Sequence, residues 1–237
     1  MTLMISKFRW LLSCSLVLVL AACAPLTVPP KEEFPAGRAR LVLPPGTWQD
    51  LGSIDETVGG VPLQTRSVGL RGAQGEWMAV LRVQTNRGGA LSGGAPWSGE
   101  CPRARDVTVD DAAKESPVRA DCLRFKRWAS SGDWLLKNEP ELARWASGQR
   151  ISWSQPYSHL GYRYATDRGA LVAVDALVDH RLLRPKTQNN EEFLTAGRPA
   201  LAWSHALAEA ARLSVGMVDG YLAVPPFPYA EAALARR

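Results

Sequence analysis

The chain has 237 residues, of which 46% are hydrophobic and 22% are charged, and its formal net charge is +5. This composition excludes a collagen, a coiled coil and a wholly disordered chain, and the length fits one ordinary domain or two small ones. The only long uncharged apolar run lies near the N-terminus, which excludes a polytopic membrane protein.

The N-terminus has the pattern of a secretory signal. Lys7 and Arg9 form a positive segment, and an apolar run over residues 10–20 follows it. This run is too short to span a bilayer comfortably, so we expect a cleaved signal peptide and not a membrane helix.

Residues 20–23 read Leu-Ala-Ala-Cys and close the signal. This run resembles the cleavage site of bacterial lipoproteins. The resemblance implies removal of residues 1–22, a diacylglycerol on the Cys23 thiol and a further acyl chain, such as palmitate, on its amine. Two such chains suffice for stable membrane anchoring, at roughly 0.8 kcal/mol per buried methylene. Ala24 in place of Asp implies sorting to the outer membrane, facing the periplasm. The alternative is an ordinary signal that leaves the thiol free.

Residues 23–37 contain the lipidation site and a Pro-rich segment, which is typical of a tether. We therefore expect a single globular domain over residues 38–237. Removal of the signal leaves 26 basic against 23 acidic residues, a balance that does not favour nucleic acid as a partner.

Short β-type runs separated by turn residues follow the tether. They predict strands at 38–43, 61–70, 76–85, 122–128, 162–166 and 170–178. The glycines in residues 72–75 predict one hairpin, and Asp167-Arg168-Gly169 predicts another, since Gly169 can take the positive φ that a tight turn needs. Residues 86–99 are glycine-rich and predict a loop.

Two cysteines remain besides the lipidation site and the one in the signal. In an exported protein, Cys101 and Cys122 are expected to form a structural disulfide, which would stabilise the fold by roughly 3 kcal/mol. The alternative, a redox-active pair, lacks the C-x-x-C spacing that such pairs use. The residues between them are polar, so we expect the disulfide to hold an exposed excursion against the core.

Two helices are marked by their end signals. The first covers residues 139–146, with Asn138 as its cap, Glu141 completing a capping box and Gly148 after its end. The second covers residues 199–215. Its apolar stripe consists of Trp203, Leu207, Ala210 and Ser214.

A helix with such a stripe needs a surface to lie on, and the predicted strands provide one. The sequence therefore predicts an α+β fold, an antiparallel β-sheet with a C-terminal α-helix packed on one face, plus one short helix.

The common signatures of nucleophiles, metal sites and nucleotide loops are missing, so we predict no catalytic residue, no metal and no cofactor. Asp175 and His180 suggest a carboxylate and imidazole cluster. However, Asp175 and Asp179 on a strand lie about 13 Å apart, too far to share a metal, and only a helix would bring them together.

Tryptophan is abundant, and most of its side chains should lie in the core. Trp97 and Trp134 instead fall in a predicted loop and turn, and Arg103, Arg105 and Arg127 are the basic residues considered with them. Exposed aromatic rings beside arginines can stack on a sugar ring or hold a partner, so these five residues form a candidate binding patch.

These features predict a lipid-anchored envelope protein with a non-enzymatic binding or structural domain, whose partner is an envelope protein or glycan. One alternative is an envelope hydrolase acting on cell-wall or lipid material through an unfamiliar site. Another is a carrier of a small ligand, which would need an apolar cavity under the long helix.

Overall fold

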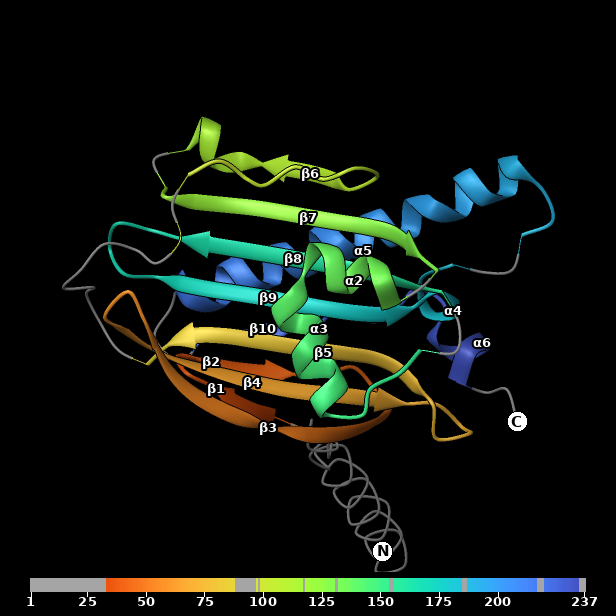
Figure 1. Cartoon of the computed structure of the whole chain (residues 1–237), viewed down its shortest axis with the longest axis horizontal. Helices are drawn as coiled ribbons and strands as arrows, with labels where there is room; N and C mark the ends of the chain where they lie inside the picture. Colours follow the sequence, from red (N-terminus) through yellow and green to blue (C-terminus); the bar gives the residue numbers. More distant parts are fainter. Residues whose placement is uncertain are drawn as a thin grey trace, which may run out of the picture. The chain divides into compact units, whose positions relative to one another are not determined.

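The computed structural model describes residues 33–87, 97, 99–116, 118–130, 132–153, 156–184, 187–216 and 220–234. The signal peptide, Cys23 and most of the predicted tether and glycine-rich loop lie outside these residues. The described part is an α+β domain, as the sequence predicts, with an antiparallel sheet and a long C-terminal helix behind it (Figure 1).

The main sheet is antiparallel throughout, in the order β3-β4-β5-β9-β8-β7-β6, so β3 and β6 are outermost. Its strands are β3 (Thr47–Val58), β4 (Val61–Arg71), β5 (Trp77–Asn86), β6 (Thr108–Asp111), β7 (Ala120–Ala129), β8 (Tyr157–Ala165) and β9 (Leu171–Asp179). Both predicted hairpins are confirmed. Gly169 has φ +87° between β8 and β9, and Gly75 has φ +78° between β4 and β5.

A second sheet has three short strands, β1 (Glu33–Ala36), β2 (Ala39–Val42) and β10 (Tyr221–Ala223), with β2 in the middle. Strand β1 lies within residues 23–37, which the sequence assigns to the tether, so the last residues of that segment belong to a sheet. The end of β1 is fixed to the main sheet because the Thr85 hydroxyl donates to the Ala36 carbonyl at 2.6 Å.

Helices cover both faces of the main sheet, α2 and α3 in front and α5 behind (Figure 1). The helices are η2 (Ala112–Glu115), α2 (Gly132–Asn138), α3 (Pro140–Gly148), α4 (His180–Leu183), α5 (Asn190–Gly216) and α6 (Ala230–Leu234). Behind the sheet, Trp203 and Leu207 belong to the same buried cluster as Phe125 of β7. The apolar stripe predicted for the long helix therefore does meet the sheet.

Helix α5 starts at Asn190 and not near Pro199. The reason is a reciprocal capping box, in which the Glu192 amide donates to Asn189 Oδ1 at 2.8 Å and Asn189 Nδ2 donates to Glu192 Oε1 at 3.0 Å. These two hydrogen bonds stabilise the first turn of the helix, which begins nine residues before Pro199.

The predicted cap of α3 is wrong. Asn138 is the last residue of α2, a helix missing from the prediction, and its Nδ2 donates to the Trp134 carbonyl at 2.7 Å. Glu139 precedes Pro140 at the start of α3 and makes no side-chain cap there.

Candidate functional site

A row of charged residues crosses the centre of the sheet on the face that carries α2 and α3. In the strand register, Arg82 of β5 lies opposite Asp175 of β9. Asp175 also lies opposite Gly161 of β8, and Gly161 lies opposite Arg124 of β7. Residues directly opposite each other share a face of the sheet. Because Gly161 has no side chain, the row opens into a hollow between Asp175 and Arg124.

This hollow has a volume of about 450 Å³ and adjoins a second one of about 220 Å³. Trp97, Arg163 and Asp175 line both hollows. We call the combined space the sheet-face groove. The other groove residues used below are Arg82, Arg124, Glu139, Gly161, Thr65, Glu56, Glu100 and Glu141.

The carboxylate in the middle of the groove is held in its charged form. Burial raises the pKa of Asp175, but the neighbouring His159 imidazole and the charges of Arg163 and Arg82 outweigh burial and hold that pKa below its ordinary value. His159 Nε2 lies 3.8 Å from Asp175 Oδ1, which is beyond direct hydrogen-bond length. Asp175 therefore remains a carboxylate at neutral pH.

The three arginines of the groove differ in their partners. Arg124 forms an ion pair with Glu139 of the α2–α3 connection, in which the two side chains are 16% and 14% exposed. The Arg82 guanidinium lies 4.8 Å from the centre of the Trp145 ring of α3. Within the described part of the chain, Arg163 forms neither a hydrogen bond nor an ion pair. Arg82 likewise forms no ion pair within the described residues, and the charges of Arg163 and Arg82 both act on Asp175, whose pKa they lower.

The predicted disulfide is present and forms part of the groove wall. Cys101 and Cys122 are bonded, their Cα atoms lie 5.4 Å apart, and both line the larger hollow. Cys122 belongs to β7, while Cys101 starts the excursion that contains β6. The Cys101 amide also donates to Asp111 of β6 at 3.3 Å. The disulfide thereby fixes one wall of the groove to the sheet.

The residues of the predicted binding patch are found in separate places. Trp97 lines the groove and also packs against a small apolar cluster of the sheet. Trp134 lies on α2, with its ring centre 5.5 Å from that of His159. Arg103 and Arg105 are exposed on the segment that precedes β6. The structure does not gather these side chains around one surface.

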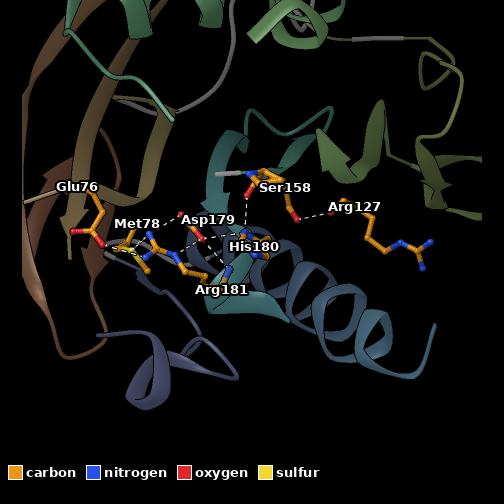
Figure 2. A network of polar contacts seen from close by, with 8 residues as sticks. Glu76, Met78, Arg127, Ser158, Asp179, His180 and Arg181 are labelled. Carbon is orange, nitrogen blue, oxygen red and sulfur yellow. Dashed lines mark hydrogen bonds and ion pairs between the residues drawn. The ribbon is translucent and has the colours of Figure 1, made fainter. Parts of the chain in front are cut away.

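Arg127, the fifth residue of the patch, packs against α5 behind the sheet. Its guanidinium lies 5.0 Å from the centre of the Phe193 ring, and the Arg184 guanidinium lies 4.4 Å from the same ring. Burial, together with the charge of Arg127, lowers the pKa of Arg184 to about 10. Figure 2 shows the Arg127 side chain directed away from Ser158, whose hydroxyl donates to the Arg127 carbonyl at 2.7 Å.

A polar network at the end of β9 is centred on Asp179. Asp179 caps α4 by accepting from the Arg181 amide at 2.8 Å, and it also accepts from the Arg181 guanidinium at 3.0 and 2.9 Å (Figure 2). Arg181 reaches on to Glu76 of the β4–β5 connection at 3.2 Å. The network ties the start of α4 to that hairpin, which is a structural role.

The suggested cluster of Asp175 with His180 is not formed. The segment is a strand, so Asp175 faces His159 in the groove, while His180 Nδ1 lies 3.4 Å from Asp179 Oδ1. Among the described residues, no group of three or more His, Cys, Asp or Glu side chains is placed to hold a metal ion. No helix within them is long and apolar enough to cross a membrane.

Sequence patterns do not single out the arginines of the groove, although a signal exists. Arg82, Arg124 and Asp175 each interrupt a strand whose neighbouring residues are mostly apolar. Only the order of the strands in the sheet shows that these three residues lie in one row on the same face.

The fold and the groove define an α+β domain with a charged hollow on one sheet face. Protein-family models, curated proteins and solved structures gave no match to this chain.

Two strand glycines allow a direct test of the hollow. A Cβ at Gly161 would make ordinary contacts, 3.4 Å from His159 Cε1 and 3.7 Å from Asp175 Oδ1, whereas a Cβ at Gly69 would overlap the Trp77 ring. We expect Gly161→Ala to raise the free energy of unfolding by about 0.5–1 kcal/mol. Gly69→Ala should lower it by about 1–3 kcal/mol. Urea denaturation of both variants measures the difference, and a destabilised Gly161→Ala would contradict the open space described above Gly161.

Proposed function

We propose that the protein is a lipid-anchored envelope protein whose non-enzymatic domain binds an envelope component, protein or glycan, in the sheet-face groove. The lipoprotein-like run at residues 20–23 supports attachment through Cys23 to a membrane, the outer membrane facing the periplasm. The observation that carries the binding role is the hollow above Gly161, which charged side chains surround and none fills.

Physical chemistry favours a ligand for such a hollow. Placing guanidinium and carboxylate groups in a partly enclosed space removes water from them at a cost in free energy. Ligand pockets combine an apolar or aromatic lining with a small number of polar groups that fix the ligand's orientation, and in this groove Trp97 lies beside the charged side chains. In this groove the hollow and the charged side chains around it are already in place without a bound ligand.

The groups present in the groove suit recognition better than nucleophilic attack. Among its described lining residues, Thr65 supplies the hydroxyl, which donates to Glu56 at 3.2 Å and accepts from Gln84 at 3.1 Å. The two lining cysteines are joined in the disulfide. His159 is only 2% exposed. A hydrolase that used a hydroxyl, thiol or imidazole as its nucleophile or base would therefore require a rearrangement of the groove.

The carrier hypothesis would place a ligand in an apolar cavity under α5, where the described residues form a packed core. A largely apolar hollow of about 680 Å³ lies elsewhere, between residues 44–46 and residues 226–234, beside α6. Glu231 is the one charged residue among the described residues that line this apolar hollow, whereas several charged side chains converge on the sheet-face groove, and for that reason we place the binding function in the groove.

The anchor is tested by Cys23→Ala in the full-length protein expressed with its own signal. We expect the wild type in the membrane fraction, with a mature mass that includes acyl chains, and the variant without them. A bare thiol on the mature wild type, or a processed Cys23→Ala form that is equally membrane-bound, would remove the anchor from the proposal.

The binding role is tested by filling the hollow. We expect immobilised wild-type protein, extracted from membranes in detergent, to retain an envelope component that Gly161→Leu does not retain. Gly216→Leu is the matched control, because a Cβ at Gly216 meets nothing within 4 Å. Equal retention by Gly161→Leu, with an unchanged melting temperature, or turnover of an envelope substrate by the wild type would contradict a non-enzymatic binding role for the groove.

A further inference from the structure

A separate hollow of about 420 Å³ lies behind the sheet, between β7, the start of β6 and the first half of α5. Phe125 and Arg127 of β7 line it, and so do Leu194, Arg198 and Leu201 of α5. It shares no described lining residue with the sheet-face groove. Basic and apolar side chains therefore meet at a second place on the domain.

Arg127 is held at this hollow by α5. A Cβ at Gly197 would lie 2.8 Å from Arg127 Nη1, so the absence of a side chain there makes room for the guanidinium. The Arg127 guanidinium also lies 5.0 Å from the centre of the Phe193 ring. Residues 193 and 197 are four apart and share a face of the helix. The Arg127 side chain therefore lies along that face.

Arg184 brings a second positive charge to the same ring. Its guanidinium lies 4.4 Å from the ring centres of both Trp128 and Phe193, and the residue is 3% exposed. Its Nε and Nη1 atoms are buried and have no hydrogen-bond partner among the described residues. Because burial and Arg127 lower its pKa only to about 10, Arg184 is still charged at neutral pH. The two rings attract this charge without neutralising it.

Positive charge exceeds negative charge around the hollow. Arg127 and Arg198 line it, and within the described residues neither side chain forms an ion pair or a hydrogen bond. Asp106 is the carboxylate among the described lining residues. It lies 3.9 Å from Lys126 and 3.9 Å from Arg105, so its charge is already compensated.

The acids at the start of α5 do not cancel this excess. Glu192 accepts from the Gln188 amide at 2.8 Å and from Asn189 at 3.0 Å. Glu191 is exposed and lies about 10 Å from Arg198 along the helix axis, where water and salt screen it. The cations counted here are Arg105, Lys126, Arg127, Arg184 and Arg198, and the acids are Asp106, Glu191 and Glu192. The balance favours an anionic ligand.

Exposed apolar side chains lie beside these charges. Leu194 is 59% exposed and Trp128 is 38% exposed. The Trp128 ring centre lies 6.2 Å from that of Phe193, so both belong to the same place on the surface. Tryptophan and arginine side chains that flank exposed aliphatic ones are typical of surfaces that contact lipid headgroups. We call Arg127, Trp128, Arg184, Phe193, Leu194 and Arg198 the α5 basic cluster.

We propose that the α5 basic cluster binds an anionic phospholipid of the membrane, with Arg127 and Arg198 donating to its phosphate and Leu194 and Trp128 against its acyl chains. Guanidinium groups match the geometry of a phosphate, and Arg184 adds positive charge from below. This inference goes beyond the binding function of the groove. It uses only the proposed anchor at Cys23, which would hold the domain beside a membrane.

The test is isothermal titration calorimetry of the detergent-extracted full-length protein with dihexanoyl phosphatidylglycerol, dihexanoyl phosphatidylcholine and inorganic phosphate. We expect phosphatidylglycerol to bind most tightly. Arg198→Gln changes an exposed side chain and should lower that affinity about tenfold, since a hydrogen bond between charged groups is lost. Arg168→Gln removes the same charge from the exposed β8–β9 turn and should leave it unchanged.

Leu194→Gln separates a lipid from free phosphate. The exposed position of Leu194 means that the substitution should leave the fold intact. We expect this variant to bind phosphatidylglycerol more weakly and inorganic phosphate as the wild type does.

Equal affinity for phosphatidylcholine, tighter binding of inorganic phosphate or absence of binding to all three probes would overturn the inference. An unaffected Arg198→Gln or Leu194→Gln variant would also overturn it. These outcomes are distinguishable from failure of the proposed function, because Gly161→Leu should bind phosphatidylglycerol as the wild type does, and the acyl mass at Cys23 is measured separately.

Discussion

Asp179→Ala is expected to lower the free energy of unfolding by about 3 kcal/mol, because removing one member of a buried ion pair leaves its partner uncompensated. Asp179 is 1% exposed and accepts hydrogen bonds from both the amide and the guanidinium of Arg181. The loss stays near the lower end of the range for buried pairs, because Arg181 is 23% exposed and keeps Glu76 as a partner. Urea denaturation of the two proteins at neutral pH measures the effect.

Two further variants separate charge from capping. Asp179→Asn retains an oxygen for the Arg181 amide and should be less destabilising than Asp179→Ala. Glu76→Gln alters the outer, more exposed pair and keeps an oxygen that can accept from the Gln74 amide, so it should cost less than about 1 kcal/mol. If Glu76→Gln proved as costly as Asp179→Ala, the network would not be centred on Asp179.

The effect of Asp179 should also depend on pH. Burial raises the pKa of this carboxyl, but hydrogen bonds from His180 and Arg181 outweigh burial and lower it below the ordinary value of 3.8. A lowered pKa in the folded state means that the stabilisation is complete above the unfolded value and is lost as pH falls through the folded value. The difference in stability between wild type and Asp179→Asn should therefore shrink below pH 4, as about one proton is taken up.

Breaking the disulfide is expected to lower the free energy of unfolding by about 3 kcal/mol, since the unfolded chain then gains the entropy of an open loop. The two cysteines are 21 residues apart in the sequence. The loss should reach the groove as well, because Cys101 and Cys122 form part of its wall. We expect the Cys101→Ser/Cys122→Ser variant to melt at a lower temperature and to retain less envelope component than the wild type.

Reductant provides the control for the disulfide. Dithiothreitol should lower the melting temperature of the wild type toward that of the double variant and leave the double variant unchanged. A wild type that is insensitive to reductant, while its disulfide is shown to be reduced, would mean that β6 and its flanking residues are held by other contacts.

Local patterns predicted those parts of the fold that neighbouring residues determine. Asp167-Arg168-Gly169 forms the β8–β9 hairpin because Gly169 takes a positive φ, and the apolar stripe around Trp203 and Leu207 faces the sheet. The predicted start of α5 is wrong because Pro199 is tolerated inside this helix, while the capping box that begins it depends on polar residues far from the apolar stripe.

The candidate site cannot be predicted from the sequence of any single strand. Arg82, Arg124 and Asp175 belong to strands β5, β7 and β9, and only the sheet order brings them into one row. Trp97 could be chosen from the sequence because it is an aromatic residue in a glycine-rich segment. The sequence suggests Arg127 only as a basic residue for the patch, and the structure places it on the opposite face of the sheet from Trp97.

The outermost strands of the main sheet carry acidic side chains, which affects whether crowded copies of the domain can associate through their sheet edges. Strand β6 is four residues long and ends in Asp110 and Asp111. Strand β3 contains Asp50, Asp55 and Glu56, and its register shifts after Asp50. Short length, irregular pairing and like charge all oppose edge-to-edge joining of sheets. Neighbouring copies held at high density on one surface should therefore stay separate and leave their grooves open.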